Sequence, residues 1–128
     1  MAACPCGLGA AYETCCGRYH EGPQHLLAPT PEALMRSRYS AYALGLRDYV
    51  LDTWHASTRP EQMQRFDSGV KWLGLTVKRA WTASADEGFV EFVARNRPRG
   101  GGPAERLHEL SRFVRNEGRW QYLDAAET

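Results

Sequence analysis

The sequence predicts an α+β fold in which helices precede an antiparallel sheet, with a small cysteine-rich segment in front of both. Three observations lead to this prediction. All four cysteines fall within the first 16 residues, apolar side chains recur at helical spacing between residues 33 and 55, and an alternating pattern follows Gly69. Helices followed by consecutive strands indicate helices that cover one face of a four-stranded sheet.

Length and charge limit the classes of function. A chain of 128 residues supports one domain plus a small appendage. Its 16 basic and 15 acidic residues give a formal net charge of +1, so no global field attracts it to nucleic acid or anionic lipid. No apolar run approaches the roughly 20 residues that span a bilayer, so we expect no membrane partner.

The cysteines are typical of a structural zinc site. Two thiols separated by one residue, then two adjacent thiols eight residues later, give four soft ligands that a short chain can fold around one ion. Zinc takes such tetrahedral shells and has no redox chemistry. A closed shell leaves no position for substrate, which argues against metal catalysis. The expected zinc ligands are Cys4, Cys6, Cys15 and Cys16.

The fourth ligand has an alternative. Neighbouring side chains on a helix diverge by about 100°. We therefore expect Cys16 to reach the ion only where the backbone breaks at Gly17, and His20 is the reserve ligand.

Disulfides and redox catalysis explain the cysteines less well. A bond between adjacent cysteines, or between Cys4 and Cys6, would be strained. The spacing also differs from that of thioredoxin motifs. Residues 1–20 contain no basic-then-apolar secretory segment, so we expect a reducing cytoplasm.

The helices follow from capping signals and periodicity. Thr30 supplies a capping hydroxyl, Pro31 suits the first helical position, and Gly45 is a left-handed stop after a helix ending at Leu44. Residues 18–29, with His20 and His25, are expected to form a solvated surface connector. Two further helical segments are predicted over residues 46–55 and 60–66.

Four strands account for the remainder. In the first, Leu73, Leu75 and Val77 should share one face, with Trp72 on the other. A glycine-rich tract from 98 to 103 must be a loop. The predicted strands cover residues 71–78, 89–95, 107–115 and 119–124.

The segment from Cys4 to Gly17 resembles the SEC-C family of small zinc fingers in its ligand spacing. In that family, lysines of the finger help it to contact acidic partners. Here Ala10 and Ala11 stand where lysines are common, and Leu8 stands where serine is common.

The whole chain resembles the YchJ family of bacterial proteins. This resemblance implies a SEC-C finger over residues 1–22, joined to a nuclear-transport-factor-two-like domain over residues 23–128, in which a curved sheet wraps a long helix as a cone. It implies no established activity. The matching motifs cover residues 34–42, 53–55, 72–77, 88–95 and 111–113.

The mouth of the cone is the expected place for a small ligand. Asp52 could orient His55 for acid–base work, and Arg112 shares a strand face with His108, where it could hold an anion or pair with Glu91. Most of the candidates are expected to be core residues. The candidate pocket residues are Tyr39, Tyr42, Trp54, His55, Trp72, His108, Arg112, Trp120 and Tyr122.

These features favour a binding or adaptor protein that recognises protein, or RNA, through its finger. The main alternative is a small-molecule enzyme or ligand-binding protein that uses the cone, with His55 or His108 as acid or base. A thiol-based metal carrier is a third hypothesis. We also expect a homodimer through the sheet. The local basic cluster that could hold RNA comprises Arg95, Arg97, Arg99 and Arg106.

Overall fold

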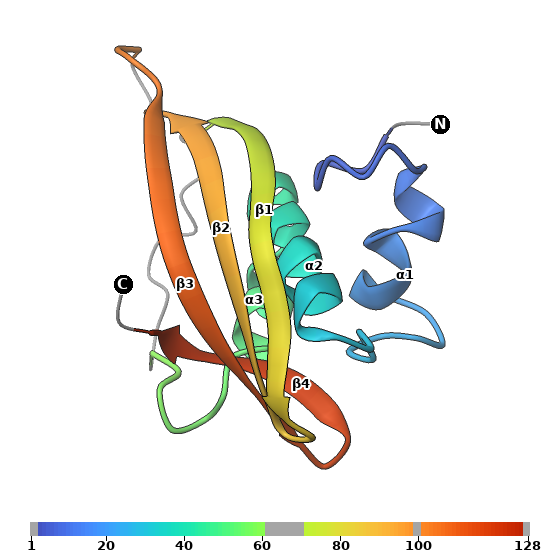
Figure 1. Ribbon diagram of the computed structural model, residues 1–128. Helices are drawn as coiled ribbons and strands as arrows, with labels where there is room; N and C mark the ends of the chain where they lie inside the picture. The colour runs from blue at the N-terminus through green and yellow to red at the C-terminus, as the bar shows by residue number, and fades with distance from the viewer. Residues whose placement is uncertain (1–2, 61–70, 99–100, 127–128) are drawn as a thin grey trace.

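The computed structural model describes residues 3–60, 71–98 and 101–126 of the chain. It has a layered α+β arrangement in which helix α2 lies between a sheet and the cysteine-rich segment (Figure 1). This arrangement confirms the predicted fold class. In chain order the elements are η1 (Tyr12–Thr14), α1 (Gly17–His20), α2 (Pro31–Leu44), α3 (Arg47–Asp52), β1 (Lys71–Ser84), β2 (Glu87–Arg97), β3 (Glu105–Asn116) and β4 (Arg119–Ala125).

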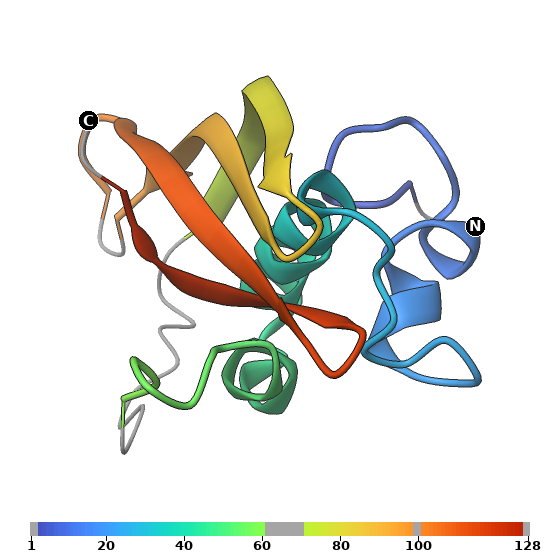
Figure 2. The same cartoon turned by 60° about the horizontal axis from the view of Figure 1, so that its bottom comes forward.

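The four strands form an antiparallel meander in the order β1-β2-β3-β4. The sheet curves around α2, which lies in its concavity (Figure 2). The largest fully buried apolar side chains come from both layers: Leu34 from α2, Val50 from α3, Val90 from β2 and Phe113 from β3. The core therefore lies between the helices and the concave face of the sheet.

Helix α2 begins and ends as its sequence predicts. The Thr30 hydroxyl oxygen accepts a hydrogen bond from the Ala33 amide at 3.0 Å, which satisfies one of the free amides of the first turn. Gly45 ends the helix with a φ of 76°, a conformation that glycine adopts without a steric penalty.

Helix α3 ends at Asp52 and is shorter than the predicted segment. The Thr53 carbonyl accepts from the Tyr122 amide at 2.7 Å, and the His55 amide donates to the Tyr122 carbonyl at 2.8 Å. Because the backbone after Asp52 pairs with β4, it cannot continue as a helix. The third helical segment predicted over residues 60–66 lies outside the described residues after Pro60.

The expected surface connector over residues 18–29 is partly buried. It includes most of α1, where Tyr19 is 6% exposed, and Ala28 is 5% exposed. His20 is half-buried, whereas His25 is exposed. The prediction was wrong for His20 because α1 packs its side chain against α2 and α3.

Strand β1 is longer than predicted and contains bulges. Trp72 pairs with Asn96 and Gly74 pairs with Arg95, so Leu73 is an extra residue in the strand. Such a bulge reverses the side-chain alternation. Trp72 therefore packs against the core with Leu75, not on the opposite face.

Within the described parts of the chain, no helix has both the length and the apolar character needed to cross a bilayer.

Candidate functional site

The cysteine loop is folded back by its glycines. Gly7 and Gly9 both have a φ of 87°, in the region that favours glycine. The Cys4 amide donates to the Ala10 carbonyl at 2.9 Å, which closes the loop. Cys4 and Cys6 are thereby brought to the same end of the finger as the second cysteine pair.

The side chains of the adjacent cysteines converge on the same cluster because the backbone turns sharply at Cys15. Cys15 has φ −117° and ψ −116°, whereas Cys16 is helical and caps α1. The expected break at Gly17 is therefore wrong: Gly17 is the first residue of α1. Its lack of a side chain matters for packing, since a Cβ atom there would lie 2.7 Å from the Tyr12 carbonyl oxygen.

All four cysteines are buried, none forms a disulfide, and their sulfur atoms lie within 4.8 Å of one another. The Cys6 and Cys15 sulfurs are 3.6 Å apart. A tetrahedral shell with metal–sulfur bonds of about 2.3 Å places its sulfurs about 3.8 Å apart. The cluster therefore fits one metal ion without rearrangement of the chain.

The thiols perturb one another strongly. The pKa of Cys6 is lowered to about 5, chiefly by a hydrogen bond from Cys16. That hydrogen bond and burial raise the pKa of Cys16, and burial together with the Cys6 thiolate raises that of Cys15 to about 11. One negative charge is thus stabilised and further ionisation is opposed. A bound cation would remove this opposition, because metal binding and thiol deprotonation are coupled.

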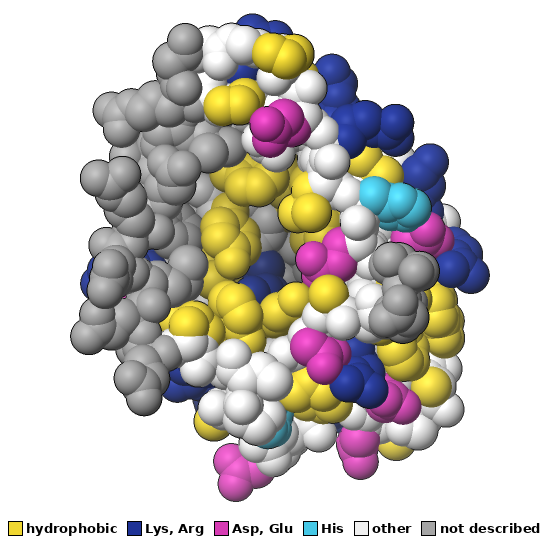
Figure 3. All heavy atoms as spheres, turned by 90° about the vertical axis from the view of Figure 1, so that its left-hand side faces the viewer, with side chains coloured by type: hydrophobic (Ala, Val, Ile, Leu, Met, Phe, Trp, Pro, Cys, Tyr) yellow, Lys and Arg dark blue, Asp and Glu magenta, His cyan; other side chains and the backbone are white. Residues whose placement is uncertain are grey.

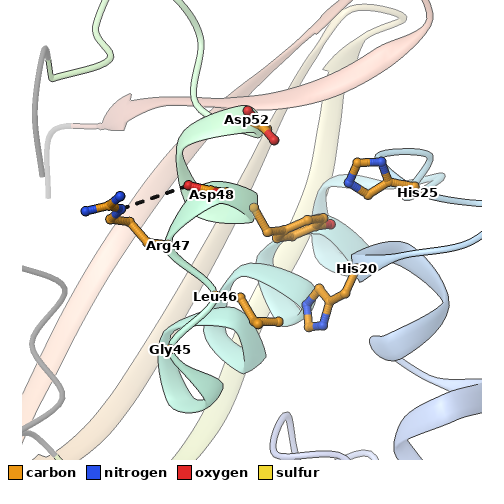
Figure 4. A pocket seen from close by; sticks show the side chains of 8 residues that line it. His20, His25, Gly45, Leu46, Arg47, Asp48 and Asp52 are labelled. Atoms are coloured by element: carbon orange, nitrogen blue, oxygen red, sulfur yellow. Dashed lines mark ion pairs between the residues drawn. The ribbon is translucent and has the colours of Figure 1, made fainter.

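His20 does not serve as the reserve ligand, because both ring nitrogens are engaged elsewhere. Nε2 donates to the Ser37 carbonyl at 2.8 Å, so Nδ1 accepts from the Tyr12 hydroxyl at 2.6 Å. The ring packs edge-on against Tyr49, 4.6 Å between centroids. The His25 ring also lies beside Tyr49, with 6.3 Å between centroids. His20 and His25 line a surface depression of about 670 Å³ (Figure 4).

The finger is packed directly on α2. The Arg36 guanidinium donates from Nη1 to the Cys6 carbonyl at 3.0 Å, and its Nε pairs with Glu32 at 3.0 Å. The Ser40 hydroxyl lies 3.4 Å from the Cys4 sulfur. The cysteine cluster and the helix of the cone therefore belong to one continuous core.

The cone contains a second candidate site, a cavity of about 340 Å³. Figure 3 shows a hollow bordered by hydrophobic side chains, with basic atoms at its bottom. Five candidate residues from the sequence line the cavity: Tyr39, Tyr42, Trp54, Trp72 and Tyr122. The other described lining residues are Met35, Arg38, Phe92, Ala94, Leu107, Glu109 and Ser111.

The four remaining pocket candidates lie elsewhere. His108 faces the outer side of the sheet, where Nε2 is 2.7 Å from Glu91, because only alternate residues of β3 point inward. Arg112 shares that outer face and pairs with Asp124 at 2.8 Å, not with Glu91. His55 bonds Ser57 at 2.8 Å, and the buried Trp120 donates to the Pro29 carbonyl at 3.2 Å.

Two charged residues that line the cavity, Arg38 and Glu109, were not among the pocket residues predicted from the sequence. Arg38 is 5% exposed and Glu109 accepts hydrogen bonds from Ser111 and Tyr122. A usable signal was present for Arg38, since it lies four residues after Leu34 on the apolar stripe of α2. An arginine on such a stripe has to be buried or to border a cavity.

Comparison with known proteins decides the family. Residues 30–125 match the family model described as "YchJ, middle NTF2-like domain". The chain belongs to the YchJ family. The match covers α2, α3 and all four strands, which is the cone described above.

Relatives extend the YchJ match over the finger. A UPF0225 protein from Chromobacterium violaceum is 60% identical over 126 residues, covering 95% of this chain and 90% of the relative. A UPF0225 protein from Bordetella parapertussis is 54% identical over 123 residues, covering 96% and 91%.

Two solved structures are similar to this YchJ family member over 98% of its length. The solution structure of a SEC-C motif containing protein from Rhodopseudomonas palustris has a TM-score of 0.82 and 37% identity, and 98% of that chain is covered. The crystal structure of a SEC-C motif containing protein from Psychrobacter arcticus has a TM-score of 0.75 and 29% identity, with 83% of that chain covered.

Proposed function

We propose that this YchJ family member is a zinc-binding adaptor protein, in which the finger recognises a partner protein and the cone holds the finger rigid. The observation that supports this best is the cysteine cluster itself: four buried sulfurs lie within 4.8 Å. The structural neighbours from Rhodopseudomonas palustris and Psychrobacter arcticus are SEC-C motif containing proteins.

Zinc in this cluster would be structural. Four cysteine ligands complete a tetrahedral shell, so no coordination position stays open for water or substrate. Cys4, Cys6, Cys15 and Cys16 would hold the ion, which contributes to folding free energy. Free adjacent thiols persist in a reducing compartment, and we propose the cytoplasm as the location.

The loop between the first cysteine pair and η1 offers the recognition surface. Leu8 is 58% exposed there, between two glycines with positive φ. An exposed leucine on a metal-anchored loop suits an apolar pocket on another protein better than a phosphate backbone. The outer side chains of the finger have mixed charge, Glu13, Arg18 and Glu21, which also favours a protein over RNA.

RNA is the second candidate partner. It would bind at the C-terminal end of β2 and the N-terminal end of β3, which pair with each other. Arg95 lies directly opposite Arg106, and both are exposed, as is Arg97. Like charges at such a position destabilise a sheet, so a bound anion would relieve them. Arg99, the fourth member of the predicted basic cluster, lies outside the described residues.

Two further proposals concern the cone. A homodimer through the sheet is supported by Trp81, which is 38% exposed on the outer face and stacks on Phe89 with 5.2 Å between ring centroids. An enzyme with His55 or His108 as base has less support, because the described lining of the cavity contains neither histidine. Light scattering of wild-type protein and Trp81→Ser measures the dimer.

A pull-down with tagged full-length protein tests the adaptor proposal. Leu8→Ser removes the apolar side chain and leaves the ligands, whereas Leu44→Ser changes a leucine that is 48% exposed at the end of α2 and serves as control. We expect Leu8→Ser and the double variant Cys15→Ser, Cys16→Ser to lose the same proteins, which Leu44→Ser retains. Capture that is unchanged by Leu8→Ser, or that disappears after ribonuclease treatment, would contradict recognition of protein by the finger.

A further inference from the structure

The cone cavity contains a buried cation that forms no ion pair with a described residue. Arg38 is 5% exposed and lines the cavity. Its Nη1 donates to the Val50 carbonyl at 2.8 Å and to the Thr53 hydroxyl at 2.7 Å, both of which are neutral. Among the described residues, no carboxylate forms an ion pair with it, and Glu109 of the same cavity acts on its charge only at longer range. Because a buried guanidinium without a direct ion pair is costly, this arrangement favours an anion from outside the chain.

The guanidinium is held in place and keeps donors available. It lies 4.7 Å from the centroid of the Tyr122 ring and 5.2 Å from that of Trp54. These contacts and the two Nη1 bonds fix its orientation. Both hydrogen bonds of Arg38 to described residues come from Nη1, which leaves Nε and Nη2 as donors for a ligand. Arginine stays protonated at neutral pH, although burial lowers the pKa of Arg38.

A second donor without a partner belongs to the same cavity. The Trp54 indole Nε1 is buried and has no hydrogen-bond acceptor among the described residues. Buried indole N–H groups usually find a partner. Trp54 lines the cavity and contacts the Arg38 guanidinium through its ring. The two unsatisfied donor groups therefore come from neighbouring side chains.

The rest of the wall is mainly aromatic, with one acceptor. Tyr39 and Tyr42 of α2 lie against Trp72 of β1, with centroid distances of 5.7 and 6.1 Å. On β3, Glu109 Oε2 accepts from the Ser111 hydroxyl at 2.5 Å and from the Tyr122 hydroxyl at 3.1 Å. Both of these bonds use the same oxygen, so Oε1 can accept a donor from a ligand.

We infer that the cone cavity binds a small aromatic carboxylate, with the carboxylate on Arg38 and the Trp54 indole and the ring against the aromatic wall. Guanidinium donors match a carboxylate in geometry and charge. Glu109 selects ligands that carry an amino or other donor group away from the carboxylate, because a second anion there would be repelled. The volume of about 340 Å³ lies within the range of small-ligand sites.

Titration of zinc-loaded, full-length protein tests this inference. Benzoate, 4-aminobenzoate and the neutral isostere benzamide serve as probes, followed through the indole N–H signals of the four tryptophans. Trp54→Phe assigns the signal of Trp54. We expect benzoate to shift that signal saturably and to bind at least about tenfold more tightly than benzamide, which is about 1.4 kcal/mol. We expect 4-aminobenzoate to bind more tightly than benzoate, and Glu109→Gln to reduce that advantage.

Variants locate the anion. Arg38→Gln should weaken benzoate binding at least about tenfold, and Trp54→Phe should weaken it severalfold. Arg112→Gln changes an arginine of the outer sheet face that pairs with Asp124, so it should bind like the wild type. Equal affinity for benzoate and benzamide, no saturable shift of the Trp54 signal, or unchanged binding in Trp54→Phe would overturn the inference. These outcomes remain decisive even where Arg38→Gln fails to fold.

Discussion

Substitution Gly17→Ala tests how closely the finger is packed. An added Cβ would lie 2.7 Å from the Tyr12 carbonyl oxygen and 2.8 Å from the Tyr12 ring. The ring can move, but the carbonyl cannot move cheaply, since it accepts the Cys15 amide hydrogen bond at 3.0 Å. The strain therefore acts on the turn that directs Cys15 and Cys16 into the cysteine cluster.

The size of the effect follows from this overlap. Forcing a methyl group into a packed site costs about 1–3 kcal/mol of unfolding free energy. For a chain of 128 residues, each kcal/mol corresponds to about 4 °C in Tm, so we expect Gly17→Ala to lower Tm by about 4–12 °C.

Thermal unfolding of zinc-loaded protein by circular dichroism measures this loss. Gly74→Ala is the matched control: a Cβ at Gly74 meets nothing within 4 Å among the described atoms, and its φ is not positive. Alanine is favoured over glycine in a strand by about 0.5–1 kcal/mol, so this variant should be as stable as wild type or slightly more stable. Equal losses in both variants would refute the packing argument at Gly17.

Three further predictions concern the interfaces of the finger and cone. Gly88→Ala should cost about 1–3 kcal/mol, because its Cβ would overlap Pro31 at the start of α2; a urea midpoint equal to that of Gly74→Ala would contradict this. Burial lowers the pKa of His20 from 6.5, so the unfolded chain binds its proton more tightly, and stability should be full above pH 6.5 and fall as the pH drops below it. His20→Gln should flatten this slope in Tm between about pH 7.5 and 5.5; parallel slopes would show that His20 is not responsible. Removal of metal with a chelator should lower the Tm of the cone as well as that of the finger, because Arg36 bonds the Cys6 carbonyl at 3.0 Å; a cone transition unaffected by chelation would show that the two parts unfold independently.

Local signals were sufficient to predict α2, α3 and the order of the four strands, whereas α1 was not predicted. The cap at Thr30, the stop at Gly45 and the alternation after Gly69 act through a few neighbouring residues, so the sequence displays them. The cysteine spacing likewise predicted which thiols converge, because a short loop has few ways to fold.

Tertiary pairing determined what the sequence could not predict. The end of α3 depends on backbone bonds between Thr53 and Tyr122, which are far apart in the chain. The bulge at Leu73 moved Trp72 to the core face. The inward or outward direction of His108 depended on the register of β3. The cavity charges were missed for the same reason, since the environment of Arg38 is assembled from α2, α3 and β4.

X-ray absorption at the zinc edge, combined with metal analysis of the purified full-length chain, tests most directly whether four thiolates hold one zinc ion in a closed shell. We predict one zinc per chain with four sulfur ligands at about 2.3 Å. A shell containing nitrogen or oxygen ligands at about 2.0 Å, or a folded chain without stoichiometric metal, would contradict the account.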